Sequence, residues 1–189
     1  MSSNKRIHIY GHVSAQPQAI ANLFDAQLAS EIVAESDLAI FAINPAAGVD
    51  QKTIDQWQAL SDFQLPRLVV VNELDGSDAD FEDAIMLANR VFDQLVTPYL
   101  VLHSESGSPV ALISLSDLQI IDYSTAPPTT SASEAEHQEL VAEFRTEYLE
   151  QIVGAGDNAF AAGLLFPAIP IVISNGLGID VVKSFIDQL

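Results

Sequence analysis

Two runs in this sequence are apolar at nearly every position: LAIFAI at 38–43 and RLVVV at 67–71. Apolar runs of this length without alternation are typical of strands in a parallel sheet that is covered on both faces. Helical patterns lie between such runs. The clearest begins at Asp80 and repeats apolar residues at steps of three or four: Phe81, Ile85, Ala88, Phe92 and Leu95. This alternation predicts an α/β fold, a three-layer, mostly parallel sheet with helices on both faces.

The remaining segments supply further strands and helices of this fold. We expect strands at 7–10 and 169–173, and helices at 19–28, at 30–35, after Asp50 and at the C-terminal end. The short strand patterns and the helix in the middle of the chain predict an inserted α+β subdomain. Its expected elements are strands at 99–103, 110–114 and 118–121, a mobile polar connector at 124–133, and an amphipathic helix with Leu140, Phe144, Tyr148 and Ile152 on one face.

The charge balance restricts the choice of partner. Asp and Glu number 26 against 7 Lys and Arg, a formal net charge of -19. Such a surface repels nucleic acid, so we expect none to bind directly, and it attracts a basic protein. There are no cysteines, which excludes disulfides and thiolate chemistry. Because neither a signal peptide nor a membrane-length apolar run is visible, we expect a cytoplasmic protein that does not bind membranes.

The segment GHVSAQPQAI at 11–20 follows the first strand and precedes a helix. A phosphate-binding loop needs G-x-x-x-x-G-K-[ST] in this setting, because backbone N–H groups, the lysine and the hydroxyl bind the phosphates and Mg²⁺. Gly11 matches the first glycine, but Gln16, Pro17 and Gln18 stand at the other three required positions. Since proline has neither charge nor N–H, it does not replace the lysine, and nucleotide triphosphate hydrolysis is not expected.

Five segments in order resemble the GTP-binding (G) domain of translational GTPases, and elongation factor G in particular. GHVSAQPQAI is similar to GHVDHGKTTL, SDLAIFAINPAAGV at 36–49 to LDGAVVVFDAVAGV, and PRLVVVNELD at 66–75 to PRIVFVNKMD. DADF at 78–81 is similar to GADF, and PIVISNGLGI at 170–179 looks like the strand and loop of the SA motif. The resemblance implies a degenerate G-domain core at 1–96 plus 169–189. It also implies an inserted subdomain at 97–168, like that of elongation factor G.

The same resemblance implies roles for individual residues. Asn72 and Asp75 survive from the NKxD guanine motif, with Glu73 at the lysine position, and Asn175 lies in the SA loop. In the family, the aspartate binds the guanine base and the asparagine ties the guanine loop to the phosphate loop. A phosphate-loop remnant would comprise Gly11, His12, Ser14, Gln16 and Gln18. The alternative is that Asn72 and Asp75 only cap the turn after their strand.

Between Phe24 and Leu38 the sequence leaves room only for helix, where the family has both switch regions and their Mg²⁺ ligands. An alternative alignment places Tyr10-Gly11-His12 on the PGH of switch II, with His8 at the Mg²⁺-binding aspartate. In both alignments the chain lacks residues that the family needs to bind the phosphates and Mg²⁺. None of the four histidines, at 8, 12, 103 and 137, pairs with another at a metal-binding spacing, so we expect no catalytic residue and no metal.

These features predict a pseudo-GTPase that acts as a binding or scaffold module, with no cofactor. The alternative is a weak GTP- or GDP-binding translation-factor homologue, whose activity, if any, would be that of a GTPase. Elongation factor G contacts the stalk protein of the large ribosomal subunit through its insert, so the resemblance implies a ribosomal or other basic partner. The sequence leaves the oligomeric state open, and also whether this is the first part of a longer factor-like polypeptide.

Overall fold

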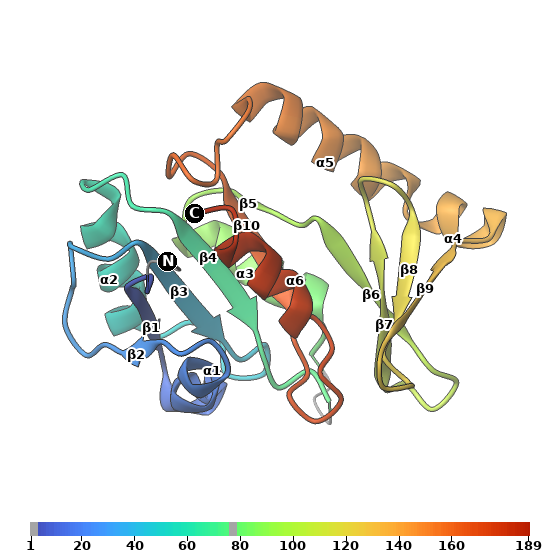
Figure 1. The fold of residues 1–189 in the computed structure, drawn as a ribbon, viewed down its shortest axis with the longest axis horizontal. Coiled ribbons are helices and arrows are strands. Elements are labelled where there is room, and N and C mark those ends of the chain that lie inside the picture. The colour runs from blue at the N-terminus through green and yellow to red at the C-terminus, as the bar shows by residue number, and fades with distance from the viewer. Residues whose placement is uncertain (1–3, 76–78) are drawn as a thin grey trace.

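The computed structural model describes residues 4–75 and 79–189, and its main sheet has six strands in the order β2-β1-β3-β4-β10-β5 (Figure 1). All five strand pairs are parallel. The strands are β1 (Ile7–Gly11), β2 (Gln27–Leu28), β3 (Leu38–Ile43), β4 (Arg67–Val71), β5 (Leu95–Val96) and β10 (Phe166–Pro170). Parallel pairing places the loops that follow β1, β3, β4 and β10 at one edge of the sheet.

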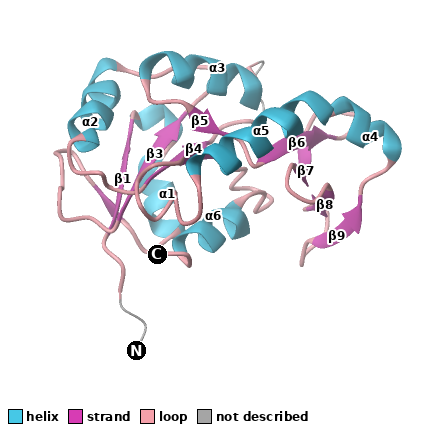
Figure 2. Ribbon diagram, turned by 90° about the horizontal axis from the view of Figure 1, so that it is seen from above, coloured by secondary structure: helices cyan, strands magenta, loops and turns pink. Residues whose placement is uncertain are grey.

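Helices cover both faces of this sheet. Figure 2 shows α2 (Gln51–Ser61) and α3 (Phe81–Val91) on one side, and α1 (Pro17–Leu23) and α6 (Ile179–Ile186) on the other. Helix α3 begins with a reciprocal capping box in which Asp80 and Asp83 each accept the other's backbone N–H. The predicted three-layer α/β class is therefore confirmed. Asp78, the first residue of the DADF segment, lies outside the described residues.

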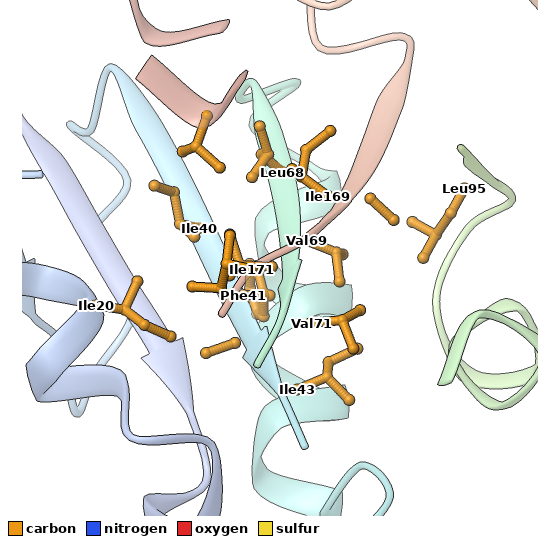
Figure 3. Packing of buried hydrophobic residues seen from close by; sticks show 14 of the residues in the cluster. Ile20, Ile40, Phe41, Ile43, Leu68, Val69, Val71, Leu95, Ile169 and Ile171 are labelled. Carbon is orange, nitrogen blue, oxygen red and sulfur yellow. The ribbon is translucent and has the colours of Figure 1, made fainter. Parts of the chain in front are cut away.

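The core lies between the layers and centres on β3 and β4, in which every residue is buried (Figure 3). Phe41 of β3 stacks on Tyr10 and meets Trp57 of α2 edge-on, both with ring centroids 5.0 Å apart. Trp57 in turn stacks on Phe92 at 4.4 Å. Aromatic pairs of this kind contribute about 0.5–1.5 kcal/mol each beyond the burial of their area. The aromatic side chains thus hold α2 and the end of α3 against the sheet.

A buried arginine completes this cluster. Arg67 is 2% exposed, and its guanidinium lies 4.2 Å from the Trp57 ring centroid and 4.4 Å from that of Phe166. Its Nη1 donates to the Trp57 carbonyl at 3.0 Å, and its Nη2 lies 3.5 Å from Asp93 Oδ2. The same carboxylate oxygen accepts the Trp57 indole N–H at 2.9 Å. Arg67 therefore joins the start of β4 to α2 and β10 through packing as well as charge.

A second sheet is antiparallel, with the order β6-β7-β8-β9. It comprises β6 (Tyr99–His103), β7 (Pro109–Ser114), β8 (Gln119–Asp122) and β9 (Thr129–Ala132), followed by α4 (Ala135–Leu140) and α5 (Ala142–Ala155). In Figure 1, α5 runs from this sheet back toward the main one. The mixed α+β character of this segment agrees with the sequence analysis, whereas the domain limits at 96/97 and 168/169 stay a prediction.

Several predicted elements differ from the observed ones. Helix α1 ends at Leu23, because Asp25 takes a left-handed conformation (φ 51°) and β2 then pairs with β1. The polar connector at 124–133 contains β9, whose backbone pairs with β8. The last strand spans 166–170 rather than 169–173. Polar composition and apolar runs did not reveal these boundaries, since backbone pairing across the sheet decides them.

Residues 30–35, predicted as helix, are an extended loop bound to β1. The Val33 N–H donates to the Tyr10 hydroxyl at 3.1 Å. The Ser36 hydroxyl donates to the Val33 carbonyl at 2.8 Å and lies 2.6 Å from His8 Nδ1. Burial, followed by the positive charge of Arg6, lowers the pKa of His8. The loop is thus held by side chains of β1, which a helical periodicity does not predict.

We expect Arg67→Ala to lower the free energy of unfolding by about 2–4 kcal/mol, because it empties the space between two rings and removes a cation–π contact. Arg6→Ala is the matched control: its ion pair with Asp37 at 3.1 Å is exposed, so solvent screens it and its loss should change stability little. Urea unfolding followed by circular dichroism measures both. Equal losses in the two variants would contradict the structural role of Arg67.

The His8 contact predicts a pH dependence of stability. Folding lowers the pKa of His8, so the folded state favours the neutral ring. The contribution of His8 to the free energy of unfolding is therefore fully present above the unfolded pKa of about 6.5. It is lost as the pH falls through the lower, folded-state pKa. The stability advantage of the wild type over His8→Asn should therefore shrink on acidification below pH ~6.5. Urea unfolding of both proteins across this range tests it, and a gap that does not vary with pH would rule it out.

Candidate functional site

The loop after β1 is the structural counterpart of the phosphate-loop remnant. It leads from β1 through a single 3-10 turn, Val13–Ala15, into α1, so the strand–loop–helix setting is present. Gly11 pairs with Ala42 of β3 and has φ 150°. A Cβ atom at Gly11 would lie 2.6 Å from the Ala42 carbonyl oxygen, too close for any other residue. Close packing of β1 on β3 is thus sufficient reason for this glycine.

The backbone N–H groups of this loop are used within the loop itself. The Ala15 N–H donates to the His12 carbonyl and the Gln16 N–H to the Val13 carbonyl, both at 3.0 Å. The Ser14 N–H donates to His12 Nδ1 at 3.2 Å. Pro17, the first residue of α1, has no N–H. Of the N–H donors that a phosphate-binding loop directs at its ligand, those at 14–16 are therefore bound by protein atoms, and the one at 17 is missing.

Two amide side chains, one buried and one partly buried, hold this loop against the neighbouring strands. Asn72, 2% exposed at the end of β4, donates from Nδ2 to the Ala15 carbonyl at 2.9 Å. Asn44, just after β3, donates to the Ser14 carbonyl at 2.9 Å. The first contact is the link between guanine loop and phosphate loop that the resemblance implies for Asn72. Sequence reasoning missed the second, although an asparagine directly after a buried strand was a usable signal.

A further contact joins the two loops over their exposed side. The Gln16 side-chain amide donates to the Glu73 carboxylate. Both residues have left-handed backbones, with φ 54° and 65°. Gln16 stands at the second glycine of the phosphate-loop pattern and Glu73 at the lysine of NKxD. The two departures from the family pattern therefore contact each other, and a carboxylate lies where an anionic ligand would need positive charge.

The remaining predicted residues lie at the same edge with different partners. Asp75 is exposed and accepts a hydrogen bond from the Ser174 hydroxyl at 3.1 Å, so the loops after β4 and β10 meet. Asn175 donates to the Pro109 carbonyl at 3.1 Å and accepts the Leu177 N–H at 3.0 Å. Gln18 bonds only along α1, to Asn22 at 3.1 Å. Guanine binding by Asn72, Asp75 and Asn175 stays a prediction.

Within residues 4–75 and 79–189, no group of three or more histidine, aspartate or glutamate side chains is placed to share a metal ion. In the same part of the chain, none of the helices combines the length and the apolar character that crossing a bilayer requires.

The chain was compared with known proteins. No family profile matches it. An elongation factor G-like protein of Mycobacterium tuberculosis H37Rv is 29% identical over 167 residues, which cover 76% of this chain and 23% of the relative. Mitochondrial ribosome-releasing factor 2 of Drosophila melanogaster is 26% identical over 126 residues, covering 64% of this chain and 17% of the relative. This chain thus spans about a quarter or less of the curated relatives it matches.

Among solved structures, a crystal structure of a protein from Thermus thermophilus superposes with a TM-score of 0.71. It is 22% identical in sequence and covers 82% of this chain and 26% of the other. At this identity the likeness concerns the fold alone. The sequence relatives and the shared fold together confirm the resemblance predicted from the motifs: this chain is related to elongation factor G-like proteins through a G-domain-like α/β fold.

Proposed function

We propose that this chain is a translation-factor-related, G-domain-like binding module of the cytoplasm that neither binds nor hydrolyses GTP. The observation that carries the proposal is the closed loop after β1. The N–H groups at 14–16 already have acceptors, and Pro17 supplies none. A phosphate entering this loop would have to break the internal bonds and would meet no lysine. Each lost hydrogen bond costs about 0.5–1.5 kcal/mol, which ligand contacts would have to exceed.

The segment at 24–37 supports the same conclusion. In the related factors the switch regions that sense the γ-phosphate lie between the corresponding helix and strand. Here this segment forms the edge strand β2 and a loop bound to Tyr10 and His8. It contains no threonine to hold Mg²⁺. A GTP-driven order–disorder switch needs a segment that γ-phosphate contacts order, and this one is ordered by β1 instead.

The partner of such a module is inferred from charge and from the relatives. A net charge of -19 favours association with a basic protein and disfavours direct contact with nucleic acid. Several relatives are named ribosome-releasing factor 2. We therefore propose a basic, ribosome-associated protein as the partner.

One observation favours a second candidate function, weak guanine-nucleotide binding. Asn72 already makes the bond to the phosphate loop, and the Asp75 carboxylate lies exposed beside Ser174. An exposed carboxylate of this kind is suited to accept paired N–H donors of a guanine base. In this candidate, base contacts alone would provide the affinity.

Calorimetry with GDP and GTP on nucleotide-free protein separates the two candidates. We expect no heat of binding at millimolar nucleotide with Mg²⁺ present, because the N–H groups at 14–16 already have acceptors, Pro17 has no N–H and the loop has no lysine. Asp75→Ala is the control. A binding heat that disappears in Asp75→Ala would overturn the proposal and favour the guanine-binding candidate.

Restoring the missing residues should restore nucleotide binding. The variant Gln16→Gly, Pro17→Lys, Gln18→Thr and Glu73→Lys rebuilds both motifs and removes the Gln16–Glu73 contact. Because a lysine and a freed loop then face the phosphates, we expect measurable GDP binding at millimolar ligand, while GTP hydrolysis stays absent. Gln16→Gly with Glu73→Gln removes the contact without adding charge and should not bind. If the rebuilt variant folds but gives no GDP heat, the defect is not local to these residues.

A further inference from the structure

A cavity of about 290 Å³ lies between α3 and α5, near the first strand of the small sheet. It shares no residue with the loops after β1 and β4. Its lining comprises Phe81, Glu82, Ile85, Met86, Asn89, Leu95, Thr97, Leu100, Phe144, Glu147, Tyr148 and Gln151. The proposed function assigns it no role.

The walls of the cavity are mainly apolar. Phe81, Leu95 and Leu100 are buried and form its base. Met86 and Phe144 are 58% and 39% exposed, although each is a large apolar side chain on a helix. Phe144 and Tyr148, which the sequence predicts on one helix face, both line the cavity, and α5 has no buried residue and leaves a gap beside α3. Water therefore contacts apolar area here that a ligand of the right size would cover.

The charges in the lining have a single sign. Glu82 of α3 and Glu147 of α5 are its charged residues, and they come from opposite walls. Within the described residues, neither carboxylate forms an ion pair. Burial, followed by the charges of Asp80 and Asp83, raises the pKa of Glu82, so its negative charge is less favourable here than in open water. A cation placed between the two walls would relieve this cost.

We propose that the α3–α5 cavity binds a small organic cation with an apolar body, such as an arylalkylamine. The apolar residues at the bottom of the cavity contact the apolar part of the ligand, and the carboxylates of Glu82 and Glu147 bind its ammonium group. The volume is at the lower end of the roughly 300–1,000 Å³ usual for ligand pockets. It is too small to enclose a helix, whose diameter with side chains is about 10–12 Å.

The test is a titration of the ¹⁵N-labelled 189-residue chain with phenethylamine, followed by NMR. We expect saturable shifts of the amides of Met86, Phe144 and Tyr148. The neutral analogue 2-phenylethanol should bind more weakly by about tenfold, since it lacks the charge-assisted contact. Glu82→Gln and Glu147→Gln should each weaken amine binding by several-fold to tenfold. The spectrum of each variant also shows whether it is folded.

The matched control is Glu143→Gln, which removes the same charge from α5 at a residue outside the cavity lining. Its amine affinity should stay within about twofold of the wild type, because Glu143 is exposed outside the cavity lining and solvent screens its charge. The proposal fails if the amine causes no saturable shifts or shifts elsewhere. It also fails if the alcohol binds equally well, or if Glu143→Gln has the same effect as the two cavity variants.

Discussion

Parallel pairing of β1, β3, β4 and β10 is the constraint on which the rest of the structure depends. It brings the loops after these four strands to one edge, although they are far apart in the sequence. At that edge Asn72 and Asn44 reach the carbonyls of Ala15 and Ser14. Because the strands are fully buried, their register is strongly specified, and the two amides can meet their acceptors only in that register.

The loop after β1 shows how protein atoms can satisfy part of a loop in the phosphate-loop position. Bound phosphate normally satisfies the N–H groups of a phosphate-binding loop. Here the N–H groups at 14–16 donate to carbonyls of the turn and to His12, and the amides of Asn72 and Asn44 hold the turn in place. Gly11 has a packing role against Ala42, so its presence is no evidence for phosphate binding.

The small sheet is attached to the same edge by polar contacts. Tyr123, buried after β8, donates its hydroxyl to Asp180 of α6 at 2.6 Å, and burial together with this contact raises the pKa of Tyr123. Asn175 reaches from the loop after β10 to the Pro109 carbonyl of β7. The loop that carries Ser174 beside Asp75 thus also contacts the second sheet. A partner that binds the second sheet would therefore contact a part of the protein that is hydrogen-bonded to the loop after β10 of the main sheet.

Elements with strong local signals were predictable. The runs at 38–43 and 67–71 are apolar because both faces of the strand are covered, and the helix after Asp80 has both its periodicity and its cap in the local sequence. The segment at 24–37 was predicted wrongly. Its conformation depends on bonds to Tyr10 and His8 of β1 and to Arg6 just before that strand, all of which come earlier in the chain. For the same reason, the partners of Gln16 and Asn44 were not predictable.

The sequence by itself determined the α/β class, the buried strands at 38–43 and 67–71, the helix after Asp80, and the absence of the lysine and second glycine from the loop after β1. These properties follow from local composition and periodicity, that is, from residues close together in the sequence. Only the tertiary structure decided that the N–H groups at 14–16 are already satisfied, that Arg67 packs between Trp57 and Phe166, and that α5 leaves a cavity beside α3. Each of these depends on contacts between residues distant in sequence, and such contacts exist only after the layers have packed.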